Sequence, residues 1–526
     1  MKKQWIISVL LCGLSVFGYA QNFEDEFNAF ARQNQLTFDR FVDSINKQFA
    51  EAMEANMRAF NGEQPKVRDP KPKPVNIPEA PQLTPKPEPQ SIPQPQLQQV
   101  PQPEPQQIPQ PEPQSVPQPE PQQVPQPQPT PLPKVDPLNP DRPAQSEPER
   151  PTLPDMGAVG PTRPSSSTPG VDHINMVAFN LFGENVQVLK EPFPDRLSGI
   201  APKNVSDFWI GLSESDYQEM MQACRDAQEK AAFNDWATYQ LVLAFARKTY
   251  EGRYNEQAVM AVFLLNQLGK EAKVGFDDQH LFCLLAVDQQ LYGVSYADIS
   301  QYRYYIFDTD PSYSSMKSRP FRTYDMPFPK PTRSLDMHIR RPLRATSSGG
   351  ANNAIQYNKN MIDLFKTYPQ VDIEVYANAA PSKEFCASVD RVLKPKTANL
   401  TPYKAVAYLL NYVQYGFDYA TDDDQFGFEK PFFCEESYFY PKNDCEDRSV
   451  LFSFLVRRLT GLDVVLIDYP GHIATAVHFP TEVSGTSLYY NGKRYVICDP
   501  TYIGAPIGLE MDQYKPADRE IVPLEK

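Results

Sequence analysis

Residues 443–456 read NDCEDRSVLFSFLV, a polar opening followed by a largely apolar run. A helix that is apolar on nearly all sides is buried inside a protein. Asp444 is a suitable N-cap, and Asp447 falls in the first turn, where a negative charge stabilises a helix. The stretch therefore predicts a central, buried helix that begins beside Cys445.

Cys445 falls in the first turn of this predicted helix. Unpaired backbone amides and the positive end of the helix dipole lower the pKa of a thiol there and favour the thiolate. Because the thiolate is the nucleophilic form, we predict a lowered pKa for Cys445 and a role in catalysis. The alternative is a structural cysteine.

Strands are expected after the helix. Residues 464–467 read as a buried strand, and a second strand starts at His472. The pair Asn491-Gly492 predicts a tight hairpin whose second strand ends at Asp499, before a proline. If the strands of His472 and Asp499 pair antiparallel, imidazole and carboxylate meet. Cys445, His472 and Asp499 would then form a nucleophile, a base and an orienting group.

These motifs resemble the transglutaminase-like superfamily, which shares the papain-like cysteine-hydrolase architecture. The matching pieces are DCED at 444–447, Gly471-His472, and CDPT at 498–501, and the resemblance spans residues 402–508. It implies an α+β fold with a central buried helix against an antiparallel sheet, and a Cys445, His472 and Asp499 triad without cofactor or metal. Members active on proteins often carry a tryptophan after the histidine, where Ile473-Ala474 stands here, so the substrate class stays open.

Other polar residues near these motifs have competing interpretations. His478 shares a strand face with His472 but lies about 20 Å along it, so only one of them can serve Cys445. Gln414 could assist an oxyanion hole, although an exposed glutamine is the simpler interpretation. The aspartates at 422–424 could bind calcium, but we favour an acidic loop. Cys434 and Cys498 are interpreted as small buried apolar residues rather than a disulfide.

An upstream segment can be aligned with the catalytic motifs. Residues 254–269 lie on 445–461 with one deletion, and His280 and Asp308 then fall on the histidine and aspartate. Tyr254 takes the nucleophile position, and a phenol of pKa near 10 cannot replace a thiolate. We interpret residues 171–310 as an inactivated transglutaminase-like copy; the alternative is coincidence between two αβ units. Residues 311–400 would connect it to a catalytic domain at 401–526.

The N-terminal third has a different composition. Residues 1–20 read as a secretory signal peptide, with lysines, an apolar run and small residues before the cut. Residues 21–62 show helical apolar spacing, which predicts an amphipathic helix for self-association or an envelope partner, or one folded back on the globular part. Residues 63–170 form a Pro/Gln-rich, disordered spacer that holds many of the 55 prolines.

The formal charge of −14 argues against a nucleic-acid partner, and the mature chain has no predicted membrane-spanning segment. Together the motifs predict a secreted cysteine peptidase or amidase acting on cell-envelope or extracellular peptides, in the periplasm or outside the cell. Cross-linking by the same acyl-enzyme stays open. The alternative is a non-catalytic envelope adaptor that binds peptides and uses the proline-rich spacer for reach.

Overall fold

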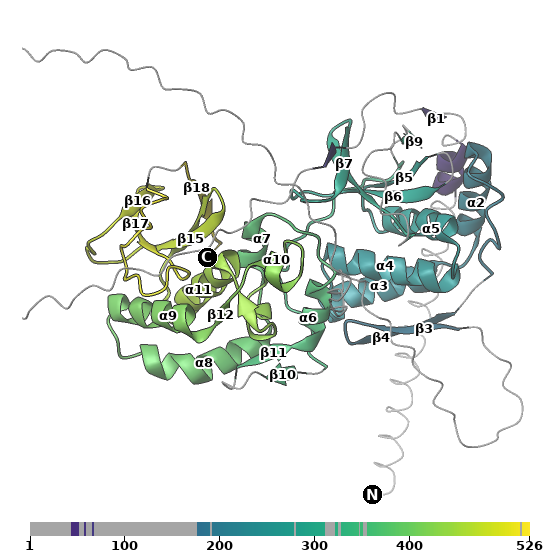
Figure 1. Cartoon of the computed structure of the whole chain (residues 1–526). Coiled ribbons are helices and arrows are strands. Elements are labelled where there is room, and N and C mark those ends of the chain that lie inside the picture. Colours follow the sequence, from purple (N-terminus) through teal and green to yellow (C-terminus); the bar gives the residue numbers. More distant parts are fainter. Residues whose placement is uncertain are drawn as a thin grey trace, which may run out of the picture. The chain divides into compact units, whose positions relative to one another are not determined.

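The computed structural model describes residues 44–51, 57–58, 66–67, 176–189, 192–277, 280–310, 321–324, 328–346, 348–350, 355–515 and 518–525 (Figure 1). The predicted signal peptide and nearly all of the predicted spacer lie outside these ranges. The described part combines helices with two large sheets that are antiparallel throughout, which confirms the predicted α+β class. None of its helices is both long enough and apolar enough to cross a bilayer.

The stretch around Cys445 forms the predicted central helix, α11 (Cys445–Thr460). Its buried residues run without a break from Cys445 to Val456, and the helix ends at Gly461, whose φ of 70° suits glycine. The strands that follow are β14 (Val464–Tyr469), β15 (His472–Val477), β16 (Ser487–Tyr490), β17 (Lys493–Cys498) and β18 (Glu520–Pro523). Their order in the sheet is β16-β17-β15-β14-β18. We call α11 with this sheet the second helix–sheet unit.

A similar arrangement occurs earlier in the chain and is called here the first helix–sheet unit. It consists of α5 (Tyr254–Gln267), β5 (Ala272–Phe276), β6 (Leu281–Ala286), β7 (Ser295–Ile299), β8 (Tyr302–Phe307) and β9 (Arg322–Tyr324). The strand order β7-β8-β6-β5-β9 repeats that of the second unit, and β1 (Met57–Arg58) and β2 (Lys66–Val67) extend the sheet at its two edges. Because β9 belongs to this sheet, the unit extends beyond the predicted boundary at residue 310.

The two units also share their strand registers. Cys283 pairs with Phe307 between β6 and β8, and Thr475 pairs with Cys498 between β15 and β17. Cys283 and Thr475 each lie three positions after the aligned histidine, His280 or His472. Phe307 and Cys498 each lie one position before the aligned aspartate, Asp308 or Asp499. The helix, the strand order and this register therefore agree between residues 254–324 and 445–523.

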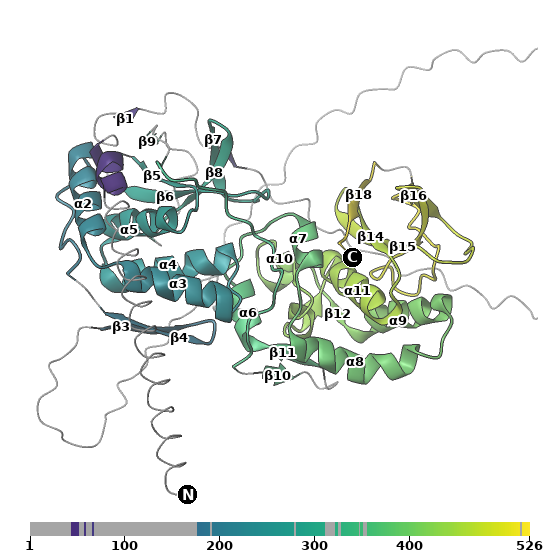
Figure 2. The same ribbon diagram turned by 180° about the vertical axis from the view of Figure 1, so that it is seen from behind.

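The remaining described elements surround these units. They are β3 (Met176–Leu181), β4 (Glu184–Leu189), α2 (Pro202–Glu214), α3 (Gln218–Lys230), α4 (Asp235–Thr249), β10 (Ser348–Gly350), β11 (Gln356–Asn358), α6 (Lys359–Phe365), α7 (Ile373–Asn378), α8 (Lys383–Thr397), α9 (Pro402–Gly416), β12 (Asp418–Tyr419), α10 (Asp422–Gln425), a 3-10 turn (Glu436–Tyr438) and β13 (Lys442–Asn443). Seen from behind in Figure 2, α8, α9 and α11 lie side by side, and all three contact one another.

The predicted helix at residues 21–62 is described at residues 44–51, where it is helical and folds back on the globular part, and at Met57–Arg58, where the prediction is wrong because these residues form strand β1 and pair with β9. Phe49 packs against Trp209 of α2 with 5.2 Å between the ring centroids and the ring planes tilted by 55°, and Ser206 Oγ donates to the carbonyl of Ala50. For these residues the fold-back interpretation holds. Residues Lys66–Val67 pair with β7, so the predicted spacer does not begin at residue 63.

Candidate active site

Cys445 is the first residue of α11 and is only 1% exposed. Its thiol donates a hydrogen bond to Glu446 Oε2 at 2.8 Å. Burial raises the pKa of Cys445 well above its ordinary value, and the neighbouring Glu446 and Asp444 carboxyl groups raise it further, whereas a hydrogen bond from the Ile473 backbone lowers it. The predicted lowering of this pKa is therefore wrong: at this helix start, desolvation and adjacent carboxyl groups outweigh the helix dipole.

His472 and Asp499 lie together, as the antiparallel pairing of β15 and β17 predicts. His472 Nε2 is 2.8 Å from Asp499 Oδ2, and both side chains are buried. The other carboxylate oxygen of Asp499 accepts hydrogen bonds from the backbone amides of Thr501 and Tyr502. The carboxylate is thus fixed from both sides and in turn fixes the imidazole.

The second ring nitrogen of His472, Nδ1, is buried and has no hydrogen-bond partner within the described residues. His472 and Cys445 line the same cavity of about 40 Å³, and the backbone of the next residue, Ile473, hydrogen-bonds to the thiol. Nδ1 is therefore the nitrogen that can accept a proton in this site, because Nε2 is held by Asp499. In this structure the thiol hydrogen points to Glu446 instead.

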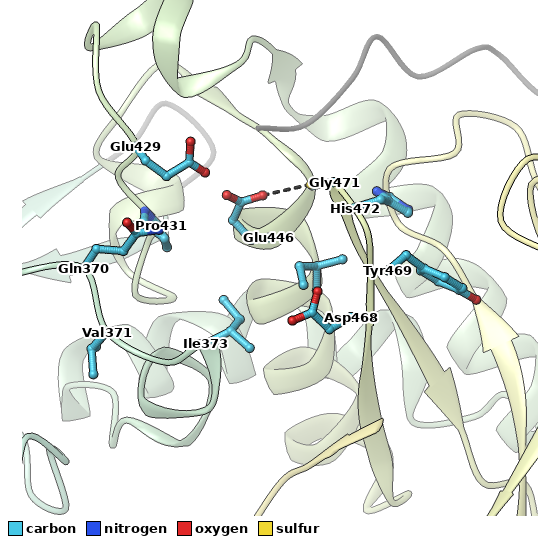
Figure 3. A pocket seen from close by; sticks show the side chains of 12 residues that line it. Gln370, Val371, Ile373, Glu429, Pro431, Glu446, Asp468, Tyr469, Gly471 and His472 are labelled. Atoms are coloured by element: carbon cyan, nitrogen blue, oxygen red, sulfur yellow. Dashed lines mark hydrogen bonds between the residues drawn. The ribbon is translucent and has the colours of Figure 1, made fainter. Parts of the chain in front are cut away.

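The cavity is small, and it is partly open to solvent. Its other walls come from Gln370, Val371, Ile373, Glu429, Pro431, Glu446, Asp468, Tyr469 and Gly471 (Figure 3). Since one water needs roughly 10–15 Å³ of such volume, the cavity has room for about three waters and not for a peptide. A substrate reaches Cys445 only when one of these walls moves.

Two aromatic residues that the sequence analysis did not identify pack against the imidazole. Tyr514 stacks on His472 at 5.0 Å with 14° between the ring planes, and Tyr469 stacks on Tyr514 at 5.0 Å. Tyr469 also donates to Glu510, which Arg519 holds in an ion pair. Tyr514 follows Asp499 along a stretch without regular secondary structure, so no periodicity in the sequence pointed to it.

Gln414 plays a part that neither sequence interpretation anticipated. It is 1% exposed, so the prediction of an exposed glutamine is wrong. Its Nε2 atom lies within 3.1 Å of the backbone carbonyls of Asp499, Tyr502 and Ala505. The side-chain amide is therefore used to fix the loop that carries Asp499, and it does not point at the cavity as an oxyanion-hole donor would.

Carboxyl groups gather around the start of α11. Three sets have ligand atoms within 4.8 Å of one another: Asp444, Cys445 and Glu446; Asp422, Asp444 and Asp447; and Asp422, Glu429 and Glu446. Both carboxyl oxygens of Asp444 are buried without a partner in the described part. Such an oxygen-rich group could hold a hard divalent cation.

The burial of these carboxyl groups has a second consequence. Burial and, after it, the neighbouring Glu446 carboxyl group raise the pKa of Asp422 to about 8 and that of Glu429 to about 10. The prediction of an acidic loop at 422–424 is wrong, because these residues form the short helix α10, and Asp422 is 2% exposed and accepts a hydrogen bond from the Lys430 backbone.

The aligned residues of the first helix–sheet unit occupy matching places. Tyr254 opens α5, His280 precedes β6 and Asp308 follows β8. The His280 ring lies 3.5 Å from Asp277, and Asp308 accepts from the Asp310 backbone, in contrast to the close pair in the second unit. Burial raises the pKa of Asp308 to about 6.

The remaining candidates lie away from the cavity. His478 Nδ1 hydrogen-bonds to the Arg494 carbonyl at the far end of β15, so it does not serve Cys445. Cys434 and Cys498 are buried, as predicted, and the six described cysteines are all free.

No protein-family model, curated protein or solved structure matches this chain.

Proposed function

We propose that this chain is a cysteine acyl-transfer enzyme with a transglutaminase-like, papain-like catalytic unit at residues 401–526. Cys445 is the nucleophile, His472 the base, and Asp499 the group that orients the imidazole. The support is the arrangement around His472: one ring nitrogen is held by Asp499, the other has no partner in the described part, and His472 lines the same cavity as Cys445.

The reaction begins when the thiol turns from Glu446 towards His472. Nδ1 takes the thiol proton, the sulfur attacks the carbonyl carbon of an amide, and the imidazolium returns the proton to the departing amine. A thioester remains on Cys445. Water, deprotonated by His472, then attacks the thioester and releases a carboxylic acid and the free thiol. An amine in place of water would give a cross-link through the same intermediate.

Of the two ways to resolve the thioester, we favour hydrolysis over cross-linking, because water is always present. The proposed substrates are peptides of the cell envelope or outside the cell. This location rests on the secretory signal at residues 1–20, which lie outside the described part. Residues 171–310 are proposed to be a catalytically inactive copy of the same architecture. The matching strand order and register support that origin, and Tyr254 stands where the nucleophile would be.

Selective alkylation of Cys445 tests the enzyme proposal. The full chain is treated with iodoacetamide at neutral pH, and modification of each cysteine is followed by mass spectrometry. Cys445 is expected to react fastest, because transfer of its proton to Nδ1 of His472 gives a thiolate. His472→Ala should slow the reaction at least tenfold, and His478→Ala serves as the matched control without effect. Equal, slow labelling of all the cysteines would refute the proposal.

A second candidate function is a non-catalytic, peptide-binding envelope adaptor. One specific observation favours it: the thiol is buried, has a raised pKa and donates to a carboxyl group instead of a histidine. For an adaptor, the alkylation rate of Cys445 would be independent of His472.

A further inference from the structure

One wall of the cavity is built by residues 370–373, which precede and begin α7. Gln370, Val371 and Ile373 face the cavity opposite His472 and Tyr469 (Figure 3). Val371 is buried, and Ile373 is the first residue of α7. We call residues 370–373 the cavity wall. Its position decides how much space lies in front of Cys445, because the opposite side is fixed in the sheet of the second unit.

The first helix–sheet unit holds this wall through the connection between β6 and β7. The Tyr292 amide donates to the carbonyl of Gln370 at 2.9 Å, and Leu291 forms an antiparallel bridge with Val371. Asp372 accepts two further hydrogen bonds, from the Gln290 amide at 3.2 Å and from the Tyr292 hydroxyl at 2.8 Å. The wall is thus paired as a short strand and clamped by its own carboxylate.

The connection that holds the wall is itself fixed within the first unit. Leu291 is fully buried, and its amide donates to the Tyr305 hydroxyl of β8. Arg303, also on β8, donates to the side chain of Gln290 and stacks on Tyr296 of β7. Strands β7 and β8 therefore determine where residues 290–292 lie, and residues 290–292 determine where the wall lies.

We propose that the first helix–sheet unit sets the size of the acyl group admitted to Cys445, with Tyr292 and Asp372 as positioning residues. This inference rests on the proposed function. A unit without a nucleophile then contributes to selectivity, because the small cavity of about 40 Å³ in front of Cys445 widens for a substrate only as far as the clamp on the wall allows. Neither residue touches the reacting atoms, so they act through the wall.

Two reagents of different size measure this control. Iodoacetamide and fluorescein-5-maleimide are reacted separately with the full chain, and the rate at Cys445 is taken by mass spectrometry. Tyr292→Phe removes one hydroxyl, and Asp372→Asn weakens the same clamp. The loss of one hydrogen bond changes an equilibrium roughly threefold to tenfold. The ratio of the maleimide rate to the iodoacetamide rate is therefore expected to rise about threefold to tenfold in both variants.

Thr367→Val is the matched control. Trp236 of α4 donates to Thr367 Oγ1, and Thr367 lies three residues before the cavity wall. This variant therefore also removes one hydrogen bond between α4 and the residues that precede the wall. It leaves the clamp formed by Tyr292 and Asp372 intact. The rate ratio should stay at the wild-type value. An equal rise in Thr367→Val would attribute the effect to general loosening and overturn the proposal, as would an unchanged ratio in Tyr292→Phe and Asp372→Asn.

Hydrogen exchange gives a reading that needs no thiol reactivity. The amides of Gln290 and Tyr292 are donors to the wall, so peptides covering residues 288–294 and 368–374 should exchange faster in Tyr292→Phe and not in Thr367→Val. Unchanged exchange in both peptides refutes the clamp even if Cys445 reacts with neither reagent. Failure of the catalytic proposal is recognised separately, as an iodoacetamide rate that does not depend on His472.

Discussion

Replacing Gln414 with leucine should destabilise the protein far more than its sequence context suggests. Gln414 lies on α9, is 1% exposed, and donates to three backbone carbonyls in the loop after β17. Leucine has nearly the same volume but no donor, so the helix packing survives while the carbonyls of Asp499, Tyr502 and Ala505 lose their partner.

The magnitude follows from the donor count. A buried acceptor left unsatisfied costs about 1–3 kcal/mol, but one amide group has two hydrogens to share among the three carbonyls. The expected loss therefore corresponds to about two hydrogen bonds, and the free energy of unfolding should fall by about 2–6 kcal/mol. Because the loop carries Asp499, the variant should also slow alkylation of Cys445.

Urea unfolding followed by circular dichroism measures the loss in stability. Asn411→Leu is the matched control, since Asn411 lies on the exposed face of the same helix, and it should change stability by no more than about 0.5 kcal/mol. If Gln414→Leu is as mild as Asn411→Leu, the three hydrogen bonds do not hold the loop, and the reasoning fails.

Three further predictions concern the same region. Ser449→Ala should cost about 1 kcal/mol in urea unfolding, because the buried Ser449 hydroxyl of α11 donates to the Ile473 carbonyl of β15; no measurable change would contradict this. Tyr514→Leu should keep the fold but flatten the pH dependence of Cys445 alkylation, because the ring stacked on His472 is lost; an unaltered pH profile would exclude a positioning role. Burial raises the pKa of Glu435 from 4.5 to about 7, so folding favours its protonated form. This contribution is complete below pH 4.5 and is lost as the pH rises through 7, by at most about 3 kcal/mol. Wild type should therefore lose more thermal stability between pH 5 and pH 8 than Glu435→Gln, and parallel melting curves would argue against it.

Local patterns in the sequence predicted the elements that depend on neighbouring residues. The apolar run after Cys445 gave the buried helix, and the Asn491-Gly492 turn gave the hairpin of β16 and β17. The pairing of β15 with β17 followed from these, and with it the contact between His472 and Asp499. A strict two-residue strand period makes such a contact predictable once the pairing is chosen.

Contacts between distant segments could not be predicted in the same way. The prediction of a lowered pKa for the Cys445 thiol was wrong. That pKa depends first on the complete burial of the thiol and then on the position of the Glu446 carboxyl group. The β-branched residues in 371–376 favour a strand, but the segment forms one bridge residue, Val371, and the first part of helix α7. Their conformation depends on the clamp from residues 290–292, to which local propensity gives no clue.

The place of β18 at the outside of the second sheet has a consequence for solubility. Its four residues pair with residues 465–468 of β14, which read VLID, and so cover the hydrogen-bonding edge of this largely apolar strand. An uncovered strand of this composition would offer its free amides and carbonyls to another chain and promote aggregation. The covering strand ends in Pro523 and carries Glu520, a ring without an N–H group and a charge, both of which discourage a further chain from pairing there. A short edge strand thus protects the sheet of the second helix–sheet unit from pairing with the edge of another sheet.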